Sequence, residues 1–350
     1  MSTTLYPWHQ KIFADWHVLS HPAHAYLVVA PADTGGEALL HTLAASVLCE
    51  NKTTDGLPCG TCTGCQLNSA HSHPDLRILR PSILDMANAI EETRPEKPSK
   101  LITIEQVRGL ANMVNQTSHR GGKRVVLVYP AQRLNASAAN ALLKTLEEPT
   151  PHTQFFLLTH DVKQLLPTII SRCQRLNAPA PDASAAIDYL TQNMGADASW
   201  PQRLAAESNA VLRVAELHAT DYFEQQHQFI SELAKGKNIN ALRLAEQLEK
   251  TIKAAEKERL SGEPRRIDMA VVITWLQRWL HDLTLAAQGV EDARYFPNEQ
   301  TTLSALAQSI AVDKLHLWQQ QLLKEQRNAE HPLNIKLWLE KLLLQYSQLF

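Results

Sequence analysis

The chain has 350 residues, of which 44% are hydrophobic and 20% charged, enough for two or three ordinary globular domains. Its formal net charge of −2 and pI of about 6.7 exclude the broad basic field of a protein that binds nucleic acid by itself, although a local basic patch remains compatible. No apolar run reaches the roughly 18 residues of a membrane span and the N-terminus is no signal peptide, so we expect a soluble cytoplasmic protein without membrane contact.

The first predicted unit is a buried strand over 25–30, a loop over 31–37, and a helix with Leu39 and Leu43 on its apolar face. This order is typical of a phosphate-binding P-loop, whose backbone N–H groups hold phosphate oxygens. Against the pattern Gly-x-x-x-x-Gly-Lys-Ser/Thr, the motif positions hold Ala30, Gly35, Gly36 and Glu37. The lysine and the hydroxyl are missing, and an acidic side chain repels a triphosphate. We predict a degenerate P-loop that binds no nucleotide; the alternatives are a residual, non-hydrolysing site and a plain helix N-terminus.

Four of the five cysteines follow this helix, namely Cys49, Cys59, Cys62 and Cys65. A tetrahedral zinc ion takes four thiolates at about 2.3 Å, and turns of the type Cys-x-x-Cys with small residues bring sulfurs onto one ion. Disulfides are the alternative, but clustered thiols in a cytosolic chain are more typical of a metal site. We predict a structural zinc module over 49–65, because four cysteine ligands leave no open position for catalysis.

The next segments contain a predicted strand over 73–79, a charged surface loop that ends near residue 100, and a helix from Ile104. Residues 119–124 form a basic glycine turn. The simpler interpretation of this turn is a solvated connection, and contact with DNA phosphates is the alternative.

The most specific part of the sequence extends from Arg124 to Cys173. It begins with a buried strand over 125–128, followed by a helix over 135–149 that Asn135 or Ser137 caps and Pro149 ends. A second apolar strand over 155–159 and then the tripeptide Ser171-Arg172-Cys173 complete it.

This series resembles the clamp-loader subunits of bacterial DNA polymerase III, which belong to the AAA+ family. In that family the first strand ends in the Asp-Glu pair of a Walker B motif, whereas this chain has Tyr129 and Pro130 there. No carboxylate is therefore available to hold magnesium. The tripeptide carries an arginine finger in the family, which implies that Arg172 acts in trans on the ATP of a neighbouring subunit. The family also has a zinc module after the P-loop helix.

From residue 178 a proline-rich linker leads to predicted helices over 183–194 and 201–219, and helical apolar spacing continues to the C-terminus, for example over 242–255. The resemblance implies an α/β AAA+ parallel-sheet module over 1–178, a small helical lid over 179–219 and an all-α collar over 220–350. Whether Arg213 is the sensor arginine of the lid stays open.

The missing motif residues, with the start Tyr6-Pro7-Trp8, resemble the delta-prime branch of the clamp-loader family. The resemblance implies an ATPase-inactive stator, a non-catalytic subunit of the polymerase holoenzyme with no ATPase or polymerase activity of its own. Its implied partners are the tau/gamma ATPases and delta, and through the complex the sliding clamp and primer-template DNA. The alternatives are a tau/gamma-like subunit with an unorthodox nucleotide site and a zinc-containing nucleic-acid-binding protein that acts alone.

Overall fold

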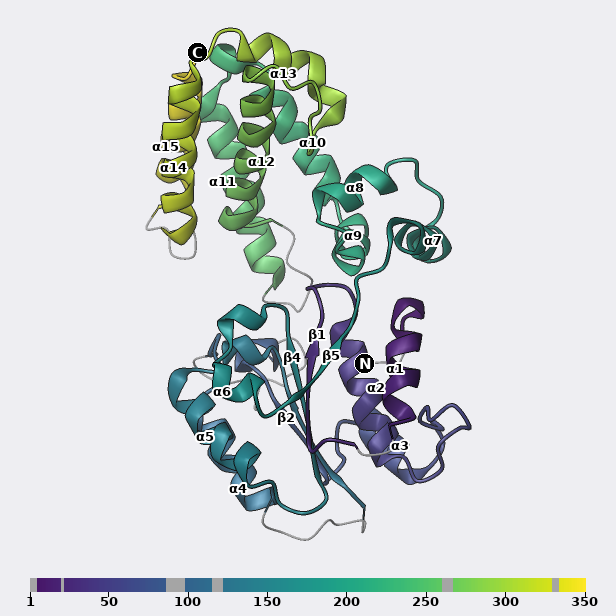
Figure 1. Ribbon diagram of the computed structural model, residues 1–350. Helices are drawn as coiled ribbons and strands as arrows, with labels where there is room; N and C mark the ends of the chain where they lie inside the picture. Colours follow the sequence, from purple (N-terminus) through teal and green to yellow (C-terminus); the bar gives the residue numbers. More distant parts are fainter. Residues whose placement is uncertain (1–4, 20–21, 86–97, 115–121, 260–266, 329–333) are drawn as a thin grey trace. The chain divides into compact units, whose positions relative to one another are not determined.

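The computed structural model describes residues 5–19, 22–85, 98–114, 122–259, 267–328 and 334–350 (Figure 1). By contacts the chain forms two compact units. The α/β unit contains the residues up to Tyr189 together with Asn209–Leu212, and the helical unit contains Leu190–Ser208 and Arg213–Phe350. The division into an AAA+ module, a lid and a collar stays a prediction.

A five-stranded parallel sheet forms the centre of the α/β unit, in the order β2-β3-β4-β1-β5. The strands are β1 (Ala25–Val29), β2 (Leu76–Leu79), β3 (Arg124–Val128), β4 (Thr153–Thr159) and β5 (Gln174–Asn177). β3 and β4 are buried along their whole length, as expected for parallel strands that helices cover on both faces. Because the strands are parallel, the loops after β1, β3 and β4 lie at one edge of the sheet, where α/β folds place their ligands.

Helices cover the two faces of this sheet with separate hydrophobic cores (Figure 1). One core contains residues of α1 (Gln10–His17) and α2 (Gly36–Leu48), and the other contains residues of α4 (Ile104–Val114), α5 (Ala136–Glu147) and α6 (Pro167–Ile170). The remaining helices are η1 (Pro7–His9), α3 (Thr63–Ser69), η2 (Ser82–Asp85), η4 (Ala131–Arg133), η5 (Val162–Gln164) and α7 (Ala183–Met194), which crosses the boundary between the units.

The predicted elements of the central block form where the sequence places them. Asn135 caps α5, because its side-chain oxygen accepts a hydrogen bond from the N–H of Ala138 at 2.7 Å. Parts of the predicted surface loop, residues 86–97, and of the basic turn, residues 119–121, lie outside the described residues.

The helical unit packs around tryptophans of a central helix. Its helices are α8 (Trp200–Ala206), α9 (Val211–His218), whose first two residues belong to the α/β unit, α10 (Tyr222–Leu233), η6 (Gly236–Asn238), α11 (Ala241–Arg259), α12 (Met269–Ala287), η7 (Pro297–Glu299), α13 (Gln300–Ala307), α14 (Val312–Asn328) and α15 (Ile335–Ser347). Trp279 of α12 donates to the hydroxyl of Tyr346 at 2.9 Å, and this hydroxyl donates to the carbonyl of Leu233 at 2.7 Å. These buried contacts tie α12, α15 and α10 together, because a buried indole N–H requires a partner.

Two expectations for this part of the chain are wrong. The predicted single helix over 201–219 is broken, because Ser208 and Asn209 have left-handed backbone with φ of 54° and 61°. An L-residue in this conformation ends a right-handed helix, and asparagine tolerates it better than most residues. The predicted apolar face of α11 is correct at Ala245, Leu248 and Ile252, but it is wrong at Leu242, which is 56% exposed. Ala241 and Leu244 face the core instead, and Leu242 lies about 100° around the helix from Ala241.

Among the described residues, no helix combines the length and the apolar character that crossing a membrane requires.

Candidate functional site

The degenerate P-loop lies at the sheet edge after β1, where Gly36 begins α2. A Cβ atom added at Gly36 would lie 2.6 Å from Cβ of Ala30 and 3.1 Å from Cδ1 of Leu158. Real Cβ atoms do not approach other atoms as closely as 2.6 Å. The position where a P-loop has its lysine therefore has no room for a side chain.

Aromatic residues of the N-terminal segment cover the same loop. Gly35 has φ of +88°, and a Cβ atom added there would lie 2.2 Å from Cδ2 of Tyr6. The ring of Tyr6 stacks on Trp8 with 5.0 Å between centroids, and the indole N–H of Trp8 donates to the carbonyl of Thr34 at 2.8 Å. Tyr189 contacts both rings edge-on. The tripeptide at positions 6–8 thus packs against the loop and covers it.

A polar cluster occupies the position of the missing Walker B carboxylates. The hydroxyl of Tyr129 lies 3.0 Å from Nε2 of His41 and accepts from Nη1 of Arg80 at 3.2 Å. Arg80 is also paired with Asp85 at 2.6 Å. Burial raises the pKa of Tyr129 and lowers the pKa of His41 to about 4. His41 is therefore neutral at pH 7, and its 3.9 Å contact with Glu37 is not an ion pair.

Around this cluster the α/β unit has a hollow of about 540 Å³. Among the residues that the structure describes, those that line the hollow include the carboxylates of Asp33 and Glu37 but no lysine or arginine. Desolvation by burial raises the pKa of Glu37, which is the largest influence on that group. A hollow with two acidic groups and no cation among its lining residues is unsuited to a triphosphate.

Filling Gly36 is expected to destabilise the protein. Gly36→Ala places a methyl group against Ala30 and should lower the free energy of unfolding by about 1–3 kcal/mol, as overpacking does. Gly109→Ala is the matched control, because Gly109 is exposed within α4 and an added Cβ meets nothing within 4 Å. The control should be neutral or stabilising by up to about 1 kcal/mol. Urea unfolding of both variants measures the difference, and equal stabilities would contradict the packing argument.

The buried His41 should make folding sensitive to acid. A histidine whose pKa is lower in the folded than in the unfolded protein stabilises the fold fully above its ordinary value of 6.5, and loses this contribution as pH falls toward about 4. We expect the contribution of His41 to lower the free energy of unfolding by on the order of 1–2 kcal/mol when the pH falls from 7 to 5. Urea midpoints at both pH values check this. His41→Gln should flatten the dependence, whereas His316→Gln, at an exposed position on α14, should leave it unchanged.

The four predicted zinc ligands come together in the structure. The ligand sulfurs of Cys49, Cys59, Cys62 and Cys65 all lie within 4.8 Å of one another. Sγ of Cys49 is 3.9 Å from Sγ of Cys62, and Sγ of Cys59 is 4.0 Å from Sγ of Cys65. Four sulfurs at about 2.3 Å from one tetrahedral ion are about 3.8 Å apart, so the cluster has the dimensions of a metal site. The cluster can bind a metal ion.

Backbone N–H groups around the cluster point at its sulfurs. The N–H groups of Cys59, Cys62 and Cys65 approach sulfurs of the cluster at 3.3, 3.3 and 3.4 Å. The N–H of Cys62 lowers the pKa of the Cys59 thiol to about 6. Gly60 has φ of +74°, a conformation that favours glycine, and it lets the chain turn between Cys59 and Cys62. Such N–H groups stabilise thiolates, the form that binds metals.

Arg172 lies between α6 and β5. The four cysteines come much earlier in the chain, after α2. Its Nη2 is 2.5 Å from Oε1 of Glu147, and its Nη1 donates to the carbonyl of Thr168 at 3.0 Å. The side chain of Arg172 is 32% exposed. The structure thus presents this guanidinium near the surface, held by acceptors of its own chain.

Thr159 and Arg213 each have a partner within this chain. The hydroxyl of Thr159, which is buried at the end of β4, donates to Oε1 of Gln132 at 2.9 Å. Arg213 on α9 is paired with Glu216 at 3.0 Å. The sensor role of Arg213 stays undecided.

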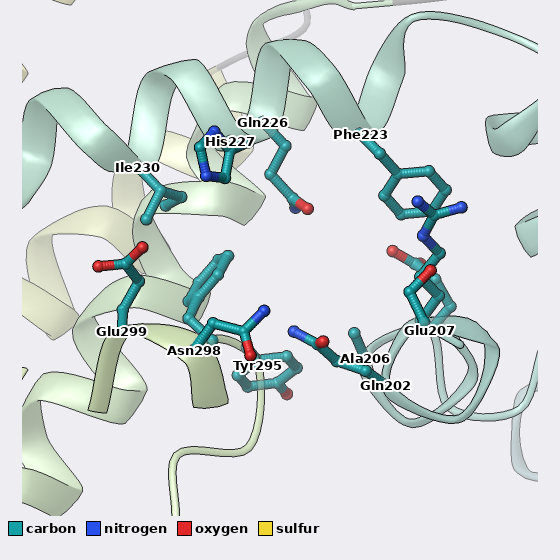
Figure 2. A pocket seen from close by; sticks show the side chains of 13 residues that line it. Gln202, Ala206, Glu207, Phe223, Gln226, His227, Ile230, Tyr295, Asn298 and Glu299 are labelled. Carbon is teal, nitrogen blue, oxygen red and sulfur yellow. The ribbon is translucent and has the colours of Figure 1, made fainter. Parts of the chain in front are cut away.

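The helical unit has a hollow of its own, of about 190 Å³, beside α8, α10 and η7 (Figure 2). Two of its charged groups have partners within the unit: Glu207 accepts from both terminal nitrogens of Arg278 at 2.6 and 3.0 Å, and Arg203 is paired with Asp197 at 3.2 Å. We assign it no ligand.

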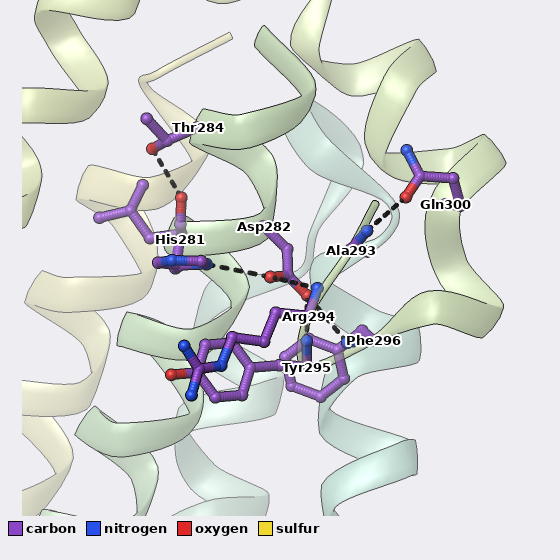
Figure 3. A network of polar contacts seen from close by, with 9 residues as sticks. His281, Asp282, Thr284, Ala293, Arg294, Tyr295, Phe296 and Gln300 are labelled. Atoms are coloured by element: carbon purple, nitrogen blue, oxygen red, sulfur yellow. Dashed lines mark hydrogen bonds and ion pairs between the residues drawn. The ribbon is translucent and has the colours of Figure 1, made fainter. Parts of the chain in front are cut away.

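A buried carboxylate binds the backbone of a segment that lines this hollow (Figure 3). Asp282, which is 1% exposed, accepts from the N–H groups of Arg294, Tyr295 and Phe296 at 3.1, 2.8 and 2.8 Å. Its role is structural, since these bonds satisfy a charge that would otherwise be costly to bury.

Sequence reasoning missed His41, Arg80 and Glu147. No spacing links Arg80 to Tyr129, because parallel strands β2 and β3 bring them together across 49 residues. In the sequence, Pro149 predicts where α5 ends, but no pattern indicates that Glu147 pairs with Arg172, 25 residues later.

Comparison with known proteins gives consistent matches. Residues 11–182 match the protein family described as "DNA polymerase III, delta subunit". The "DNA polymerase III subunit delta'" of Pseudomonas aeruginosa is 36% identical over 233 residues, 66% of this chain and 66% of that protein. The proteins of the same description from Haemophilus influenzae and Escherichia coli are 39% and 34% identical over 193 residues, which cover 54% of this chain and 53% of each relative. The match therefore spans between half and two thirds of these relatives.

One solved structure with similarity to this chain is a DNA polymerase III gamma subunit-related protein from Thermotoga maritima, with 16% identity, a TM-score of 0.40 and 97% of each chain covered.

Proposed function

Because the chain belongs to the family of DNA polymerase III delta' subunits, we propose that it is the ATPase-inactive stator of a clamp loader. In this function it holds the ATPase subunits of the tau/gamma type and the delta subunit in one assembly, and helps to place the sliding clamp on primed DNA. The observation that carries the proposal is the packing of Gly36 against Ala30 and Leu158, which leaves no room for a P-loop lysine.

The stator acts on ATP that a neighbouring subunit binds. We assign Arg172 the role of an arginine finger, whose fixed positive charge stabilises the charge that develops on the transferred γ-phosphoryl group. The support within this chain is that the guanidinium lies near the surface and is already oriented by hydrogen bonds.

The metal in the cysteine cluster is proposed to be zinc with a structural role. All four ligands are thiolates, so the shell is closed and leaves no position for a substrate or a reactive water. When bound, zinc would fix the segment between α2 and α3, which is otherwise held by few hydrophobic residues.

Nucleotide binding tests the proposal most directly. The isolated chain should bind no ATP, measured by titration with a fluorescent ATP analogue and magnesium, while the assembled complex binds it. Gly36→Lys combined with Glu37→Thr restores the lysine and the hydroxyl of the P-loop but keeps Ala30. This variant should still bind no ATP, because the added Cβ would lie 2.6 Å from Cβ of Ala30. An isolated tau/gamma-type subunit is the positive control. Binding of ATP to the wild-type chain at micromolar concentration would contradict the proposal.

A further inference from the structure

We propose that Glu147 is a positioning residue for Arg172, which holds the guanidinium in the orientation from which it reaches the neighbouring subunit's nucleotide. This inference rests on the proposed function of Arg172 and adds a second residue to it. The inference does not depend on the P-loop or on the cysteine cluster.

Acceptors from two elements hold the guanidinium. Glu147 is the last residue of α5, and its Oε1 lies 2.5 Å from Nη2 of Arg172. On the other terminal nitrogen, Nη1 donates to the carbonyl of Thr168 in α6 at 3.0 Å and to Oγ of Ser171 at 3.3 Å. Contacts on both terminal nitrogens fix the plane of a guanidinium as well as its position.

The two elements that hold Arg172 are packed against each other. α5 and α6 are in contact (Figure 1), and residues of both belong to the same hydrophobic core, among them Leu142 of α5 and Ile169 of α6. Thr168 and Glu147 therefore project from a rigid base. A carboxylate that is itself fixed can orient the arginine, whereas a carboxylate on a free loop would move with it.

Stability gives little reason for a carboxylate at this place. The end of a helix carries partial negative charge, so the macrodipole disfavours Glu147 there. The side chains of the pair are 32% and 48% exposed, and exposed ion pairs contribute little to folding. An effect on rate is a different matter, because misplacing a catalytic group by about 1 Å can cost as much as 10²-fold.

The opposite role predicts the opposite sign. A carboxylate that only sequestered Arg172 would compete with the phosphate, and its removal would raise the rate of hydrolysis. The direction of the change in rate therefore decides between orientation and sequestration.

The experiment reconstitutes the full chain with its tau/gamma and delta partners and measures ATP hydrolysis in the presence of clamp and primed DNA. At the ATP site that this chain borders, Glu147→Ala should lower kcat about tenfold and leave the KM for ATP within about twofold, because the nucleotide is bound by another subunit. Glu147→Gln should fall between wild type and Glu147→Ala, since its amide oxygen still accepts from Nη2. The matched control is Glu148→Ala, which removes the adjacent exposed carboxylate and should leave kcat unchanged.

A double variant separates positioning from a general structural effect. If Glu147 acts only through Arg172, Glu147→Ala adds no further loss to Arg172→Ala, whereas independent effects multiply. Size-exclusion chromatography confirms that each complex is assembled. An unchanged or raised kcat in Glu147→Ala, together with a large loss in Arg172→Ala, would overturn this inference and leave the proposed function intact. If Arg172→Ala itself has no effect, the finger and its positioning residue are both wrong.

Discussion

Arg172→Ala is expected to abolish hydrolysis at the ATP site that this chain borders, with a loss of about 10³-fold at that site, the lower end of the range for arginine fingers. The physical reason is that no other group replaces a fixed cation next to the developing charge of the transferred phosphoryl group. Steady-state hydrolysis by the reconstituted complex, with clamp and primed DNA present, measures the effect. Single-turnover measurement separates this site from sites between other subunits.

The control for this variant is a second arginine that lies close to Arg172 in the sequence and is more exposed. Arg175 is an exposed residue of β5, three positions after Arg172, and Arg175→Ala should keep wild-type hydrolysis. Arg172→Ala should also leave assembly intact, because its ion pair with Glu147 is partly exposed and contributes about 1 kcal/mol at most. Single-turnover hydrolysis at this site within twofold of wild type would refute the role that we assign to Arg172.

Loss of one cysteine from the cluster is expected to have the largest effect on stability. Cys65→Ser replaces a buried ligand at the start of α3, and bound zinc should fall from one ion to less than about a tenth of an ion per chain. Metal binding is coupled to folding, so the α/β unit should lose at least about 3 kcal/mol of stability. Elemental analysis of the purified protein and urea unfolding measure the two quantities, and a strong chelator should reproduce the loss in the wild type.

Cys173 provides the matched control for this substitution. It is the fifth cysteine, it packs against the core that contains α5 and α6, and burial raises the pKa of its thiol to about 12. Cys173→Ala should therefore retain the full metal content, because a half-buried neutral thiol outside the cluster is no ligand. Wild-type metal content in Cys65→Ser would show that the four cysteines do not form the site.

Local sequence patterns suffice to predict the main elements of the α/β unit. The runs over 125–128 and 155–159 are apolar without alternation, and this pattern predicts strands that are buried on both faces. Asn135 and Pro149 set the ends of α5 through local chemistry that needs no tertiary contact. The cysteine cluster was equally predictable, because its ligands lie within 17 residues of sequence and their spacing alone fits one ion.

The surroundings of these motifs depend on how segments that are distant in the sequence pack together. The amino-acid sequence of the P-loop shows that the lysine is missing. The packing of Ala30 and Leu158 on Gly36 explains why a lysine does not fit. The partners of Arg80 and Arg172 come from segments 49 and 25 residues away, and the break at Ser208 and Asn209 has no proline or glycine to signal it. Local patterns specify elements because they act between near neighbours in the chain. The side chains that meet at a site are specified by how the sheet and helices pack, which no single segment encodes.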